Sequence, residues 1–172
     1  MASRKERADA LTRIAIDYLW RNGGLVGTQI GIHGRTADVV SINWHNEIRI
    51  IEVKSCRSDF LADWKWWDYL RYSDYFYFAA LPDTITVDDL PPGIGLIEPY
   101  KHERPIDMWR SSEIVKKPRR LKLIDEVDFD VRHMLLKAFA WQSQHTVHSF
   151  CPKCGRNCIN VPASRATGAR IY

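Results

Sequence analysis

Residues 35–54, RTADVVSINWHNEIRIIEVK, decide the fold of this chain. Aliphatic and β-branched residues fill both ends of the stretch, and the segment 43–46 between them, which begins and ends with asparagine, is typical of a hairpin turn. We therefore predict two antiparallel strands, over residues 37–42 and 47–54. With a third, glycine-interrupted strand over 25–32, they form a three-stranded meander whose faces need cover from helices.

The segments on either side supply those helices and further strands. Apolar residues at helical spacing predict a first helix over residues 4–20, and 22–24 (Asn-Gly-Gly) can end it. The predicted class is therefore α/β, in the order helix, three-stranded meander, helix, strand. The other expected elements are a turn at 33–35, a helix over 58–72 with Ser58 as its N-cap, strands over 75–80 and 94–97, an irregular basic segment over 101–122, and a helix after Asp130.

Two acidic residues and a lysine fall on one face of the predicted hairpin. Side chains alternate along a strand, so Glu52 and Lys54 point to the same side as Ile48 and Ile50. Pairing through the turn brings Asp38, on the preceding strand, towards Glu52 at one end of the sheet. Buried charges are normally paired or bound to a metal.

This acidic pair has the chemistry of a Mg²⁺ or Mn²⁺ site. Mg²⁺ prefers oxygen ligands, takes few of them from protein and keeps several waters. We expect Asp38 and Glu52 to hold the ion, with Val53 as a further ligand. Such an ion orients a water nucleophile and stabilises charge on a phosphoryl group, and Lys54 can hold that water or neutralise the developing charge. A salt-bridged strand end at the surface is the alternative.

A cysteine cluster near the end of the sequence suggests a second metal site. The CPKCG run at 151–155 is a zinc-knuckle pattern, and zinc takes four ligands. The expected zinc ligands are Cys151, Cys154, Cys158 and His148. His145 or Cys56 could take the place of His148. The alternatives are that the cysteines bind an iron–sulfur cluster or that they are unliganded thiols.

The charge distribution favours a nucleic-acid partner. The net charge is +4, but residues 101–172 hold 14 Lys and Arg against 7 Asp and Glu. A basic half beside an acidic metal site suits DNA, although a solvated basic face is the simpler alternative. The sequence starts without the apolar core of a signal peptide, and no run approaches the roughly 18 apolar residues that a bilayer requires. We therefore expect a cytoplasmic protein that does not bind a membrane. The sequence is compatible with a homodimer.

Aromatic residues crowd the segment that follows the acidic strand. They can stack on unpaired bases, but most are expected to form core, because this helix must cover the sheet. The residues are Trp64, Trp66, Trp67, Tyr69 and Tyr72.

Several blocks, in this order, resemble the MmcB-type DNA repair family of the PD-(D/E)XK nuclease superfamily. They are RTADVV at 35–40, IIEVKS at 50–55 and SDFLADWKWWDY at 58–69, followed by the aromatic strand 75–78 and GIGLI at 93–97. The resemblance runs from about residue 5 to 98 and implies a restriction-endonuclease-like core. The expected domains are a nuclease-like domain, 1–142, and a Cys-rich metal-binding knob with a basic tail, 143–172.

The resemblance also assigns roles. Asp38 matches the superfamily's first acidic residue, Glu52 the second and Lys54 the lysine, while Ala37 replaces the usual proline before the first acid. An acid of the first helix joins the metal site in some relatives. The candidates for that acid are Glu6, Asp9 and Asp17, and Asp59 and Lys65 match the family without a derived role beyond helix capping and surface charge.

Three functions follow from these observations. We expect a metal-dependent DNA nuclease that hydrolyses phosphodiester bonds in DNA repair or recombination. Such a protein can be cellular or phage-associated. The alternative is a DNA-binding module of the same fold with slow or no cleavage. An adaptor whose zinc knob docks a partner protein is the third. No catalytic residue of the superfamily pattern is missing, which favours the enzyme.

Overall fold

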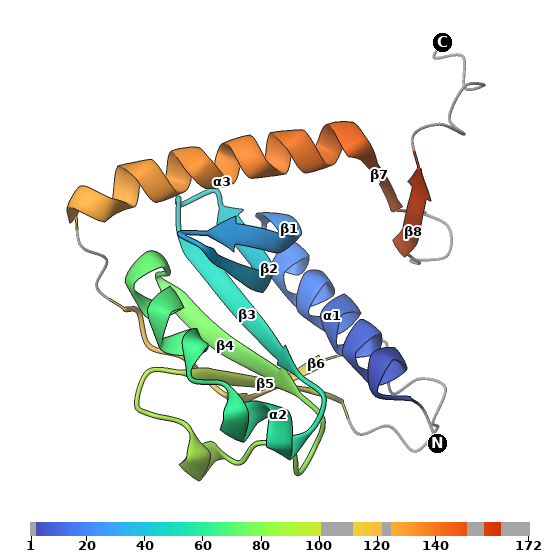
Figure 1. The fold of residues 1–172 in the computed structure, drawn as a ribbon, viewed down its shortest axis with the longest axis vertical. Helices are drawn as coiled ribbons and strands as arrows, with labels where there is room; N and C mark the ends of the chain where they lie inside the picture. Colours follow the sequence, from blue (N-terminus) through green and yellow to red (C-terminus); the bar gives the residue numbers. More distant parts are fainter. Residues whose placement is uncertain (1–2, 101–111, 122–124, 151–156, 163–172) are drawn as a thin grey trace.

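The computed structural model describes residues 3–100, 112–121, 125–150 and 157–162. A six-stranded mixed sheet forms its centre, in the order β1-β2-β3-β4-β5-β6 (Figure 1). The first three strands are antiparallel, as the meander requires, and β4 and β5 continue the sheet in parallel before β6 closes it antiparallel. The α/β class is therefore confirmed. The strands span Gly24–Ile32, Arg35–Asn43, Ile48–Lys54, Tyr75–Ala80, Gly95–Pro99 and Ser112–Lys116.

One face of the sheet is covered by α1, which spans Arg4–Arg21 as the sequence predicted to within a residue. The helix begins at a capping box, in which Ser3 and Glu6 satisfy each other's backbone N–H groups, and it ends at Asn22. Its buried stripe packs on every second residue of β3, because those residues share one face. This core comprises Leu11, Ile14, Ala15, Leu19, Val39, Ile51, Val53, Tyr77, Ala79 and Ile97.

The opposite face is covered by α2 (Arg57–Ala62), the 3₁₀ segment η1 (Lys65–Tyr72) and α3 (Asp125–His145). Figure 1 shows α2 beside the end of β3 and α3 running across the β1 edge. Ile48 and Ile50 point to this face, and by alternation so do Glu52 and Lys54. The helices contribute the buried side chains Phe60, Trp66, Tyr69, Val131, Leu135 and Phe139.

The single helix predicted over 58–72 is wrong. Asp63 interrupts it with an extended backbone, φ −93° and ψ 102°, and a 3₁₀ segment follows. Its carboxylate accepts hydrogen bonds from the Lys54 ammonium and from the backbone N–H of Lys65, which fixes the break. Ser58 is also not the N-cap, since α2 begins after Cys56 and no side chain caps it.

Two further elements depart from the sequence prediction. Residues 112–116 form β6 rather than an irregular segment, and three of its five side chains are exposed, so the strand lacked an apolar signal. The last helix begins at Asp125, five residues before Asp130. A short 3₁₀ turn, η2, spans Val87–Asp89 in the β4–β5 crossover.

The predicted domain boundary at 142/143 falls inside α3, which runs to His145. A two-stranded hairpin follows, made of β7 (Thr146–Phe150) and β8 (Asn157–Pro162). Cys151 and Cys154 lie outside the described residues, and of Cys158 and His148 only the backbone is described, within these two strands. The zinc knuckle therefore stays a prediction.

Candidate active site

The pairing of β2 with β3 places Asp38 across from Glu52. Val39 pairs with Ile51, so the register sets the two acids opposite each other. The backbone N–H of Asp38 donates to Glu52 Oε1 at 3.2 Å, and the backbone N–H of Val53 donates to Asp38 Oδ2 at 2.9 Å. The strands thus hold both carboxylates through main-chain donors, and a position set by main-chain donors does not depend on a flexible side chain.

Gln29 on β1 adds a third support. Its Nε2 donates to Asp38 Oδ1 at 3.1 Å. The Gln29 backbone is left-handed, with φ 52°, a conformation that L residues rarely adopt. Backbone strain of this kind is concentrated at functional sites, where the surrounding structure enforces it.

Lys54 lies beside Glu52 and is shared with Asp63. The Lys54 ammonium is 3.7 Å from Glu52 Oε2 and 2.5 Å from Asp63 Oδ2. Glu52 and Lys54 are buried, with 5% and 6% of their surface exposed. Asp63 was not among the predicted site residues. It stands in the SDFLADWKWWDY block, but only the break after α2 brings it to the lysine, so no sequence spacing could have identified it.

Burial raises the pKa of Glu52 to about 8, and the nearby charge of Asp38 adds to the shift. Lys54 lowers this pKa, but not enough to compensate, because the ammonium is closer to Asp63 than to Glu52. Near neutral pH, Glu52 therefore holds a proton for much of the time. A cation beside its oxygens would stabilise the ionised form.

The Lys54–Asp63 pair is ionised on both sides. Burial lowers the pKa of Lys54, but the hydrogen bond to Asp63 and the charge of Glu52 outweigh burial and raise it overall. Burial likewise raises the pKa of Asp63, yet the hydrogen bonds from Lys54 and from the Lys65 backbone lower it overall. The site thus keeps a permanent ammonium next to a carboxyl that exchanges its proton near neutral pH.

Tyr69 of η1 lies at the border of this cluster. Its hydroxyl donates to the backbone carbonyl of Thr36, two residues before Asp38, at 2.8 Å. Burial raises the Tyr69 pKa, and the charges of Glu52 and Asp38 raise it further. The tyrosine therefore stays protonated and fixes η1 over the acidic end of β2.

In the described part of the chain, no hydrogen bond or ion pair joins Glu6, Asp9 or Asp17 of α1 to the site, and Asp9 is exposed. The helix covers the other face of the sheet, Glu6 is held in the capping box by Ser3, and Asp17 pairs with Arg21 at 2.7 Å. Burial is the largest cause of the raised Glu52 pKa, and the charged groups that follow it are Asp38, Lys54 and Asp63. The acid that the structure adds is instead Asp63.

Asp59 and Lys65 occupy supporting positions. Asp59 pairs with Arg4 at 3.0 Å and so links α2 to the start of α1. Lys65 is exposed, and its contact with the site is the backbone bond to Asp63. Both fit the surface and helix-end roles considered for them.

Part of the predicted basic surface is structural. Lys116 donates to the backbone carbonyls of Leu90 and Pro91, which ties β6 to the β4–β5 crossover. Arg120 pairs with Asp74 at 3.1 Å, although its side chain stays 61% exposed. Lys117 and Arg119 are exposed and stay available to a polyanion.

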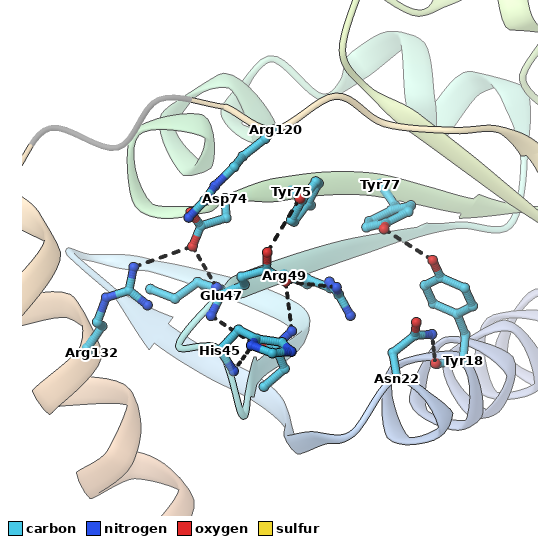
Figure 2. Close-up of polar contacts among 12 residues, drawn as sticks. Tyr18, Asn22, His45, Glu47, Arg49, Asp74, Tyr75, Tyr77, Arg120 and Arg132 are labelled. Carbon is cyan, nitrogen blue, oxygen red and sulfur yellow. Dashed lines mark hydrogen bonds and ion pairs between the residues drawn. The ribbon is translucent and has the colours of Figure 1, made fainter.

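The carboxylate of Asp74, at the start of β4, holds the other end of β3 (Figure 2). It accepts from the backbone N–H of Ile48 at 2.8 Å and pairs with Arg120 and Arg132 at 3.1 and 3.4 Å. Ile48 is six residues from Lys54, about 20 Å along an extended strand. This network is therefore remote from the acidic cluster and joins β3, β4, α3 and the segment after β6.

Among the described residues, no group of three or more His, Cys, Asp and Glu side chains is arranged to hold a metal ion. A magnesium site, however, is often built from one or two carboxylates and several waters. Asp38 and Glu52 meet that need, with each carboxylate oxygen keeping a free lone pair beside one partner. Val53 has no side-chain ligand, and its backbone N–H is directed at Asp38.

The fold and this cluster define a class: a mixed α/β protein with two acids and a lysine at one end of its sheet. A family model described as DNA repair protein MmcB-like matches residues 5–150, and the chain belongs to that family. The match extends well past residue 98, where the resemblance seen in the sequence ended.

One solved structure adds to this comparison. A protein of unknown function from Silicibacter pomeroyi has a similar fold, with a TM-score of 0.64 and 27% sequence identity over 80% of this chain and 86% of that one. Comparison with curated proteins gives no match. In the described part of the chain, no helix is long and apolar enough to cross a membrane.

Proposed function

We propose that this protein is a DNA nuclease with a restriction-endonuclease-like core, and that it hydrolyses phosphodiester bonds with Mg²⁺ or Mn²⁺ at Asp38, Glu52 and Lys54. The observation that carries the proposal is the position of Asp38 opposite Glu52, with the Lys54 ammonium 3.7 Å from Glu52. DNA as substrate and a role in repair are supported by the family to which the chain belongs.

The donor set fits a hard divalent cation. Glu52 is nearly fully buried, and burial and the charge of Asp38 raise its pKa, so a cation beside it would stabilise the ionised carboxylate. Lys54 supplies only part of the compensating charge, because its ammonium is closer to Asp63. A bound divalent ion would neutralise phosphate charge and activate a water. Asp38 and Glu52 are the residues that would hold it.

The protein's own groups have distinct tasks in this proposal. Main-chain donors and Gln29 hold the Asp38 carboxylate in one orientation, so it needs no rearrangement when substrate enters. Lys54 keeps its proton and offers it as a hydrogen bond to a phosphate oxygen as negative charge develops. Asp63 positions the ammonium, and Tyr69 borders the site as a neutral donor.

The test is cleavage of plasmid, linear and branched DNA with and without Mn²⁺. Glu52→Gln and Lys54→Ala should each reduce cleavage by about a hundredfold or more. Asp88→Asn in the β4–β5 crossover and Lys137→Ala on α3, which change an exposed acid and an exposed lysine with no assigned role, should leave it unchanged. Cleavage by the Glu52→Gln variant at the wild-type rate would refute the proposal.

A second candidate is a DNA-binding module without cleavage. The observation that favours it is the raised pKa of Glu52, since a protonated carboxyl is a poor metal ligand. Tight DNA binding with no cutting by the wild-type protein, at any pH up to about 9 and with either metal, would establish the module and exclude the enzyme.

A further inference from the structure

The 3₁₀ geometry of η1 sorts its side chains into three rows. A 3₁₀ helix has three residues per turn, so side chains at i and i+3 lie above one another. One row is buried or half-buried, one carries charges, and the third begins with two exposed tryptophans. The rows are Trp66, Tyr69 and Tyr72; Lys65, Asp68 and Arg71; and Trp64, Trp67 and Leu70.

The buried row fixes the segment to the sheet. Trp66 is 5% exposed and packs against Phe76 and Phe78 of β4, with ring centroids 5.7 and 5.3 Å apart. Tyr69 stacks on Phe76 and binds Thr36 through its hydroxyl. The outer rows therefore stand on a rigid support.

The two tryptophans of the third row are exposed, whereas Leu70 packs against the core. Trp64 is 78% exposed and Trp67 is 47% exposed. Trp67 stacks on Trp66 at 4.0 Å between centroids, so its orientation is set by the core beneath it. Exposed apolar side chains gathered at one place mark a surface that meets a partner.

The adjacent groups point to the chemistry of that partner. Trp64 follows Asp63 directly, and Asp63 holds Lys54 of the acidic cluster. The neighbouring row carries Lys65 and Arg71, both exposed. Asp68, which lies between these two cations in their row, pairs with Arg35 at 3.0 Å. Exposed flat rings beside cations suit a polyanion with free aromatic faces. A protein partner would leave the cations unexplained, and in duplex DNA the base faces are already stacked.

We infer that η1 is a stacking platform for unpaired bases, with Trp64 and Trp67 as the stacking rings and Lys65 and Arg71 as phosphate contacts. The inference rests on the proposed function, because the platform would lead single-stranded DNA past Asp63 to Asp38 and Glu52. Base–aromatic stacking tolerates any sequence, because every base has a π-face. The substrate class is therefore single-stranded DNA or a single-stranded end or flap.

Binding can be measured separately from cleavage. The Glu52→Gln protein in EDTA is titrated with a fluorescein-labelled 12-nucleotide oligothymidylate, an abasic strand with the same number of phosphates, and a 12-base-pair duplex. The oligothymidylate should bind at least about tenfold more tightly than the abasic strand, since the two differ only in their bases. Added Trp64→Ala should weaken oligothymidylate binding about tenfold and leave abasic binding unchanged.

Two further variants control for folding. Trp64→Phe/Trp67→Phe keeps aromatic faces and should retain binding within a few-fold. Trp44→Ala removes an 85% exposed tryptophan in the β2–β3 turn, at the other end of β3, and should bind as the parent does. Thermal unfolding of each variant checks that the fold is intact, and because Trp64 is mostly exposed its loss should not change the midpoint.

Equal affinity for the oligothymidylate and the abasic strand would overturn the inference. Equal weakening of single-stranded and duplex binding by Trp64→Ala would also overturn it. So would self-association of the parent protein that Trp64→Ala abolishes, since the row would then be an interface between copies. If Trp64→Ala weakens binding but no form cuts DNA, the platform stands and the nuclease fails. If the wild-type protein cuts DNA and Trp64→Ala changes neither binding nor cutting, the nuclease stands and the platform fails.

Discussion

The protonation of Glu52 makes a quantitative prediction about stability. A carboxyl whose pKa is near 4.5 in the unfolded chain and about 8 in the folded protein binds its proton more tightly when folded. Its contribution to stability is full below the unfolded pKa and is lost as pH rises through the folded one. Between pH 5 and pH 8 the loss amounts to about 4 kcal/mol, at about 1.4 kcal/mol for each pH unit.

The neighbouring groups do not mask this change. The pKa of Lys54 is raised and that of Asp63 is lowered, so both keep their charges across the whole window. Glu52→Gln replaces the carboxyl with a neutral group of the same shape. The difference in unfolding free energy between wild type and Glu52→Gln should therefore change by about 4 kcal/mol between pH 5 and pH 8, whatever other groups titrate.

The assay is urea unfolding in EDTA at half-unit pH intervals, followed by tryptophan fluorescence. If the two proteins have parallel pH profiles, burial does not raise the Glu52 pKa and the reasoning fails. Repeating the series with 10 mM Mg²⁺ examines the metal: an ion at Asp38 and Glu52 should stabilise the wild type above pH 7 and leave Glu52→Gln with a much smaller gain. An equal gain in both would place the ion elsewhere.

Three other predictions have direct measurements. Asp63→Asn should lower the pKa of Lys54 and shift the alkaline limit of any cleavage activity to lower pH; an unchanged pH–rate profile would contradict the role given to Asp63. Asp74→Ala leaves the buried backbone N–H of Ile48 without its acceptor and removes the partner of Arg120 and Arg132, and should lower the free energy of unfolding in urea by about 1–3 kcal/mol. An unchanged midpoint would argue against the network. Cys151→Ser and Cys154→Ser should each remove bound zinc detected by mass spectrometry of the intact holoprotein, and zinc-free wild-type protein would disprove the knuckle.

The parts of the fold that follow from local pattern were predictable. The alternation of Ile48, Ile50 and Glu52 assigned each side chain to its face, and the β2–β3 turn then fixed which acids meet. The first helix and the aromatic strand Tyr75–Ala80 agree with their predicted bounds within a residue. In each case, one segment contains both the periodic spacing of apolar residues and the turn or cap that ends the element.

What could not be predicted depends on contacts between distant residues. Asp63 ends α2 because Lys54, nine residues earlier on a strand, draws its carboxylate inward. Nothing in the segment 58–72 records that contact, so an unbroken helix was the natural expectation. The same holds for Gln29, whose left-handed backbone is stabilised by Asp38 on the next strand rather than by glycine or asparagine at its own position.

β6 was missed for a different reason. Its outer position leaves Ile114 and Val115 partly exposed, and Lys116 is recruited by backbone carbonyls, so the strand carries no alternating pattern. Its neighbour β5 supplies the hydrogen-bonding partner, and sequence alone does not reveal such a partner.

The attachment of Asp63 to Lys54 has an evolutionary consequence. Asp63, which ends α2, also fixes Lys54 of the proposed active site, and the next residue, Trp64, begins the exposed tryptophan row. A relative that has lost this lysine would also lose the contact that positions the tryptophan row. Cleavage and binding of single-stranded DNA would therefore be lost together. If the proposed function holds, relatives that lack the lysine at position 54 should therefore also differ at the positions of Trp64 and Trp67.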